Sequence, residues 1–233
     1  MTLENLRAFA RAIIPGCKTD VVSNILLDQL LNAGVHDIAV YTKCLPTNKK
    51  FSAVASQGDI LNPYIISTVI GDYLLPDKAG LWWNRGTVAA PDYKQLWPRT
   101  EAWLDKNRPN WRDIDDGDPQ DYLIHGNNLI IIPAPDTALT DAFWLFYFKT
   151  PTTMANVASY PFSGSTTEFT HLSMFDLAII KWVAWQIFPM LNKNQDANMS
   201  LAEYIKIREE KYSLYKRRPD ISNSSDAALK GRL

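Results

Sequence analysis

Residues 174–191 read MFDLAIIKWVAWQIFPML and form the most apolar part of this 233-residue chain. Apolar side chains lie on every side of a helix drawn through them, and only three residues interrupt the pattern: Asp176, Lys181 and Gln186. Such a helix is covered by protein on several sides, and the three polar residues argue against a membrane span. We therefore predict a helix over residues 171–192, capped by Thr170 and with a candidate kink at Pro189, at the centre of a bundle. On this prediction Trp182→Ala costs about 3–5 kcal/mol.

Two further helices are predicted near the N-terminus. Thr2 can cap the first, in which apolar residues recur at helical spacing as far as Ile13. The second is expected to begin after a cap at Thr19 or Asp20 and to end at Pro46, because proline cannot continue a helix.

The C-terminal part of the chain is more polar. Ser200 and Glu203 have the spacing of a capping box, so a last helix is expected from there to about Arg218, before Pro219. Residues 199–233 carry three more positive than negative charges, with tyrosines among them. This leaves nucleic-acid stacking open, although a solvated helix face or a protein-docking surface fits so small an excess better.

Residues 47–151 follow a β pattern instead. Residues 121–125 and 128–132 flank a Gly-Asn pair, which predicts a β-hairpin. Residues 51–56 alternate like a strand, and residues 143–149 are strongly aromatic. The hairpin and these two strands together predict an antiparallel meander.

The order of elements predicts an α+β fold. A helical bundle is expected from residues 1–46 and 152–218, and residues 47–151 form an inserted antiparallel β-rich domain. A short helix is expected within the insert over residues 100–107. Residues 219–233 have few apolar side chains, so they are expected to be an extended C-terminal tail, disordered in an isolated chain.

No motif points to catalysis. Three histidines (His36, His125 and His171) lie in different predicted elements, without metal-ligand spacing. The aspartate run over residues 113–118 fails the calcium-loop pattern, because its glycine falls fifth and its twelfth residue is isoleucine. We expect no enzyme activity, no catalytic residue, no metal and no other cofactor. A ligand-binding or enzymatic groove lined by the tryptophans of the insert is the alternative.

Charge and cysteine content exclude other classes. The net charge of -1 gives no general attraction to nucleic acid or membrane. The two cysteines, Cys17 and Cys44, form no CxxC pair and no disulfide framework. If one continuous helix separates them, their Cα atoms lie roughly 36 Å apart, so both are expected to be free thiols.

Two motifs of the insert resemble a known family. Residues 96–111 read LWPRTEAWLDKNRPNW and residues 117–133 read GDPQDYLIHGNNLIIIP. They resemble the signature of head-to-tail adaptor proteins, also called head-completion or connector proteins, of tailed bacteriophages. AIIPG at 12–16, PAP at 133–135 and YFKTP at 147–151 add to the likeness. The chain departs from the pattern at Arg99, where threonine is expected, and in its longer tail.

The resemblance implies a structural subunit of the virion neck. Such adaptors form a ring, usually of twelve copies, that binds the portal protein on one side and a tail or nozzle protein on the other. DNA passes through the lumen without sequence-specific binding, no membrane is involved, and assembly takes place in the host cytoplasm. A stopper or tail-tube subunit is the alternative. Given this resemblance, we expect docking, most of all on the portal, by these residues: Lys216, Arg217, Arg218, Ile221, Leu229, Lys230, Arg232 and Leu233.

Overall fold

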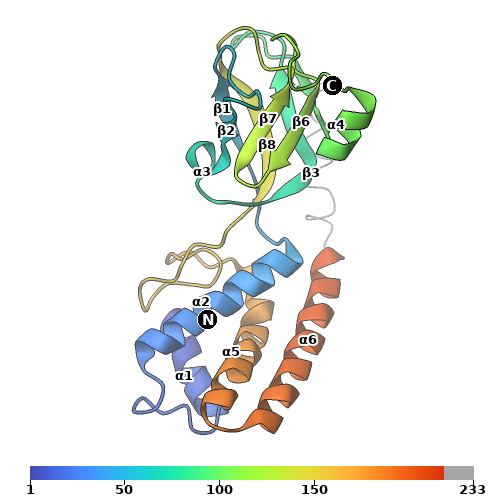
Figure 1. Ribbon diagram of the computed structural model, residues 1–233. Helices are drawn as coiled ribbons and strands as arrows, with labels where there is room; N and C mark the ends of the chain where they lie inside the picture. The colour runs from blue at the N-terminus through green and yellow to red at the C-terminus, as the bar shows by residue number, and fades with distance from the viewer. Residues whose placement is uncertain (218–233) are drawn as a thin grey trace. The chain divides into compact units, whose positions relative to one another are not determined.

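The computed structural model describes residues 1–217 and divides into two compact units. Residues 1–45 and 150–217 form a helical unit, and residues 46–149 form a β unit (Figure 1). Each unit has a hydrophobic core made of its own residues. The predicted α+β class, with helices from both chain ends flanking a β-rich region, is confirmed. The tail predicted for residues 219–233 lies outside the described residues.

The helical unit begins with α1 (Leu3–Ile13) and α2 (Asn24–Thr42). The predicted cap of α1 is confirmed, since the Thr2 hydroxyl accepts a hydrogen bond from the backbone N–H of Asn5 at 3.3 Å. α2 continues unbroken through Gly34. The periodicity of apolar residues therefore predicted both helices correctly as elements.

The start of α2 differs from the prediction. Ser23 caps it, rather than Thr19 or Asp20, because the Ser23 hydroxyl accepts from the N–H of Leu26 at 3.2 Å. The residues before Ser23 form turns. In them the N–H of the buried Val22 donates to the carbonyl of Lys18 at 2.8 Å. Val22 fits the helical stripe equally well, so periodicity alone could not reveal these turns.

Three C-terminal elements complete the helical unit: η1 (Thr170–Phe175, a 3-10 helix), α5 (Asp176–Met190) and α6 (Asn194–Lys216). The helix predicted over 171–192 is thus a 3-10 segment followed by an α-helix that ends one residue after Pro189. Its predicted central place is confirmed, because α5 packs against α1, α2 and α6 (Figure 1).

The capping box predicted at Ser200 and Glu203 is wrong. α6 begins at Asn194, and Ser200 lies buried within it, 6% exposed. Ala197, one turn earlier, is buried as well, so the inward face of the helix already exists before the supposed cap. Glu203 instead pairs with Lys181 of α5, at 2.5 Å between Oε2 and Nζ.

The β unit contains two four-stranded sheets. The first has the order β1-β8-β3-β4, with these bounds: β1 Pro46–Ala53, β8 Leu139–Lys149, β3 Tyr73–Asn84 and β4 Tyr93–Gln95. The second has the order β2-β7-β6-β5: β2 Tyr64–Ile65, β7 Asn128–Ile132, β6 Asp121–His125 and β5 Trp97–Pro98. Two short helices are α3 (Ile66–Val69) and α4 (Glu101–Asn107).

The hairpin and the short helix predicted for this unit are confirmed, the strand predicted over residues 51–56 is instead Pro46–Ala53, and the long-range prediction is wrong. β6 and β7 form the predicted hairpin, and the Thr100 hydroxyl caps α4 by accepting from the N–H of Trp103 at 3.2 Å. The predicted meander is wrong, because β8 pairs with β1 and β3 and not with the hairpin. β3 was not predicted; its proline and glycine interrupt the alternation and its register shifts twice against β8.

Gly34 makes the close approach of α2 to α5 possible. A Cβ placed on Gly34 would lie 3.3 Å from Cε3 of Trp182 and 3.5 Å from Cγ2 of Ile179. Trp182 is only partly buried, so the cost predicted for Trp182→Ala assumed more burial than the side chain has.

We expect Gly34→Val to destabilise the protein by about 1–3 kcal/mol through overpacking against Trp182, although helix propensity alone would favour replacing glycine. Urea unfolding measures this cost. In a Trp182→Ala background the same substitution should cost less, because the ring that it strikes is gone. Ala33→Val, at the exposed neighbouring position, is the control. Equal urea midpoints for wild type and Gly34→Val would show that the helices are not in close contact.

Both cysteines are free and buried, Cys17 with 1% and Cys44 with 2% of its surface exposed. Burial raises the pKa of both thiols, that of Cys44 to about 11. Only the thiolate reacts, so we expect very slow labelling of the native protein at neutral pH. A thiol titration in denaturant without reductant should give two groups per chain. A smaller number would contradict the two free thiols.

Candidate docking surface

The basic end of α6 holds the two predicted docking residues that the structure describes. Lys216 and Arg217 are both exposed there. The Lys216 Nζ lies 4.2 Å from the ring centroid of Tyr212, and the Tyr212 ring meets that of Tyr41 from α2 edge-on at 5.4 Å. The structure therefore brings Lys216 and Arg217 together on a helix end that is braced against α2. The other predicted residues lie outside the described part: Arg218, Ile221, Leu229, Lys230, Arg232 and Leu233.

Arg208 fixes α6 to α2 about two turns before that end. Its guanidinium lies 3.7 Å from the ring centroid of Tyr41, and its Nη1 lies 3.6 Å from a carboxylate oxygen of Asp37. The Tyr204 hydroxyl donates a hydrogen bond to the same carboxylate. Burial, with Asp37 nearby, raises the pKa of Tyr204, which therefore stays a neutral donor. Sequence reasoning missed the role of Arg208 and Asp37. The signal available was the spacing, since Arg208 follows the inward-facing Tyr204 by four residues.

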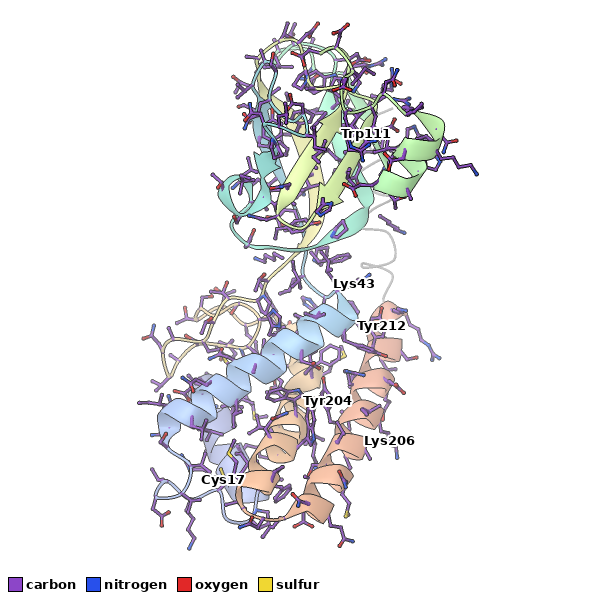
Figure 2. The ribbon with its side chains drawn as sticks, viewed as in Figure 1. Cys17, Lys43, Trp111, Tyr204, Lys206 and Tyr212 are labelled. Carbon is purple, nitrogen blue, oxygen red and sulfur yellow. The ribbon has the colours of Figure 1, made fainter. Side chains whose placement is uncertain are left out.

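The tyrosines of α6 do not form a nucleic-acid stacking platform. Tyr204 is 2% exposed and Tyr215 is 4% exposed, and both belong to the core of the helical unit. The Tyr215 hydroxyl donates to the backbone carbonyl of Cys44 at 3.3 Å. Figure 2 shows Tyr204 and Tyr212 directed toward α2 and Lys206 directed away from it. Tyr204 and Tyr215 are thus buried while Lys216 and Arg217 are exposed, which suits docking of a protein better than stacking of bases.

The motif at residues 96–111 builds an ion cluster inside the β unit. Asp121 on β6 is 1% exposed and receives two arginines. Arg99 Nε donates to its Oδ1 at 2.9 Å, and Arg108 Nη1 lies 3.0 Å from its Oδ2, outside hydrogen-bond geometry but within ion-pair distance. The Arg99 guanidinium also stacks on Trp103, at 3.8 Å from the ring centroid. Arg99, at the position where the resemblance led us to expect threonine, is therefore part of the attachment of α4 to the sheet.

Other residues of the two motifs also pack and form hydrogen bonds inside the β unit. Trp111 is 3% exposed, packs between α4 and the sheet, and donates its Nε1–H to Asp105 at 2.9 Å (Figure 2). Hydrogen bonds from Arg112 and then Trp111 lower the pKa of Asp105. Trp83 Nε1–H donates to Asp118 at 2.9 Å. Trp83 and Trp111 are therefore structural and are not available to line the ligand groove that was the alternative.

The histidines and acidic residues of the described part of the chain form no recognisable metal centre. His125 Nδ1 lies 3.2 Å from an oxygen of Glu101, on the exposed side of α4. Within residues 1–217, no three or more His, Cys, Asp and Glu side chains are placed to hold a metal ion. In that same range, each helix is too short or too polar to cross a membrane.

Replacing Asp121 by asparagine tests the ion cluster. We expect Asp121→Asn to lower the free energy of unfolding by about 2–3 kcal/mol, because two arginines would then face an uncharged amide in a partly desolvated site. Asp92→Asn is the control, since Asp92 pairs with Arg85 at the surface and its side chain is 61% exposed. Chemical unfolding measures both. Equal stabilities of the two variants would refute the structural role of Asp121.

The comparisons with known proteins extend over both units. The family profile described as SU10 adaptor protein matches residues 1–227. No curated protein matches the chain. This is a phage adaptor family of structural proteins of the virion and not a family of enzymes. A match over nearly the whole chain, through a fold whose signature residues are structural, leads to one conclusion: the protein belongs to the SU10 adaptor protein family.

Proposed function

We propose that this protein is a head-to-tail adaptor that forms a ring beneath the portal of a tailed phage. The family match over residues 1–227 carries the proposal. In this role the ring, of about twelve copies by analogy with such adaptors, joins the capsid to the tail or nozzle protein and lets DNA pass through its lumen. Two units with separate cores suit a connector, because each can present a surface of its own to a different partner.

The C-terminal segment is the proposed docking element. It begins with Lys216 and Arg217 at the braced end of α6 and continues with Arg218, so three positive charges follow one another. A cluster of exposed cations attracts an acidic surface, steers its encounter and disfavours basic partners. In this proposal the acidic surface belongs to the portal. Ile221 supplies an apolar contact close to these charges.

Removing these charges tests portal docking. We expect the combined change Lys216→Gln, Arg217→Gln and Arg218→Gln to weaken binding to isolated portal rings about tenfold or more at low salt. Its melting temperature should stay close to that of wild type, because Lys216 and Arg217 are exposed. Lys206→Gln, an exposed lysine on the same helix, is the control. Co-sedimentation with portal rings measures the binding.

Unchanged portal binding by the triple variant would remove the basic end of α6 as the docking element. Binding of the wild-type protein to tail tubes, with none to portal rings, would favour the stopper or tail-tube role instead.

A further inference from the structure

Three loops gather at the end of the β unit where β1 and β7 finish and β6 and β8 begin. They comprise residues 54–63, 113–118 and 133–138, which we call the tip. The Ser56 N–H donates to the carbonyl of Pro135 at 2.9 Å, and the Ser56 hydroxyl donates to Asp116 at 2.5 Å. The Gly117 N–H donates to the carbonyl of Ala134 at 2.7 Å. These bonds link all three loops, so the tip is one surface.

The tip exposes large apolar side chains. Leu61 is 91% exposed, Val54 is 51% exposed and Ile114 is 46% exposed. The turn that carries Leu61 is well held: Oδ1 of Asp59 accepts from the N–H groups of Leu61 at 2.9 Å and Asn62 at 2.5 Å. A leucine on a turn that hydrogen bonds already hold costs little backbone entropy to bury, and its apolar surface is free to be covered in a protein contact.

The surroundings of these apolar side chains are acidic. The three loops contain six aspartates and no lysine, arginine or histidine. Asp113, Asp115 and Asp136 are exposed. Oδ2 of Asp118 lies 4.0 Å from Nζ of Lys94 on β4. A partner of this surface therefore needs positive charge beside apolar side chains.

This chain contains such a partner in its last residues. Residues 227–233 read AALKGRL, with two leucines, Lys230, Arg232 and no acidic residue. We infer that the tip is the docking site for residues 227–233 of a neighbouring copy, with Leu229 or Leu233 packed beside Leu61 and the two cations facing the aspartates. The contact would join adjacent copies, while the basic residues next to α6 face the portal.

The length of the chain after α6 permits this contact. Residues 218–233 can span at most roughly 53–58 Å when fully extended, at about 3.3–3.6 Å per residue. That reach exceeds the diameter of roughly 35 Å expected of a compact domain of about 100 residues. The inference rests on the proposed function, because a ring holds copies side by side and so raises the effective concentration of a segment that would bind weakly in dilute solution.

A peptide of residues 221–233 tests the inference without the portal. It is labelled and titrated with full-length protein carrying Lys230→Gln and Arg232→Gln, which removes competition from the chain's own segment. We expect saturable binding in fluorescence anisotropy that weakens as salt is added. On this receptor, Asp113→Asn with Asp115→Asn, and separately Leu61→Asn, should each raise the Kd about tenfold or more. Asp20→Asn, an exposed aspartate of the helical unit, should leave it unchanged.

A charge exchange separates direct contact from an indirect effect on the fold. The receptor with Asp113→Lys and Asp115→Lys should no longer bind the wild-type peptide. It should instead bind a peptide with Lys230→Glu and Arg232→Glu. Absence of binding to the unaltered tip, or binding that ignores the tip substitutions, would overturn the inference. Neither result affects portal docking, which involves Lys216 to Arg218 and is measured on portal rings.

Discussion

Pro46 and Phe148 lie opposite each other in the antiparallel pair of β1 and β8, and the rest of the structure depends on this pairing. The chain leaves the helical unit at Leu45 and returns to it at Thr150, so both connections are at the same end of one strand pair. An insertion whose ends lie together does not force apart the elements on either side of it. For this reason α5 can pack against α1 and α2 although the whole β unit comes between them in sequence. Helices from both ends of the chain form the bundle. The contact of Gly34 with Trp182 shows how closely α2 and α5 pack.

The parts of the fold that could be predicted are those decided by neighbouring residues. Thr2 caps α1 and Thr100 caps α4 through N–H groups three positions away, and the turn at Gly126 joins two strands of five residues. The parts that could not be predicted depend on distant residues. Asn48 and Trp144, which share a hydrogen bond between β1 and β8, are 96 positions apart. The start of α6 likewise follows from a packing face that Ser200 shares with Ala197, whereas the local pattern at Ser200 resembled a cap.

The candidate docking surface also has a part that the sequence predicted and a part that it did not. Composition alone indicated a basic C-terminal region, and Lys216 and Arg217 are indeed exposed at the end of α6. Composition could not distinguish them from Arg208, which has the same charge but is used to hold α6 against Asp37 and Tyr41. The tip was beyond sequence reasoning, because its three loops are far apart in the chain and hydrogen bonds in the folded unit bring them together. In the sequence, the aspartates of residues 113–118 were notable only because they fail the calcium-loop pattern. No sequence pattern predicted that Leu61 would be exposed.

The residues that most resemble the adaptor signature serve the fold. Asp121 pairs with Arg108, Asp105 accepts from Trp111, and Thr100 caps α4. Residues with these contacts hold the shape of the β unit, and they say little about the partner that the unit meets. Partner choice must then depend on surfaces outside the signature. Here two such surfaces differ in sign, since the end of α6 is basic and the tip of the β unit is acidic. Opposite charges on one protein disfavour a basic partner at one surface and an acidic partner at the other, which suits the proposed role of joining different neighbours in a fixed order.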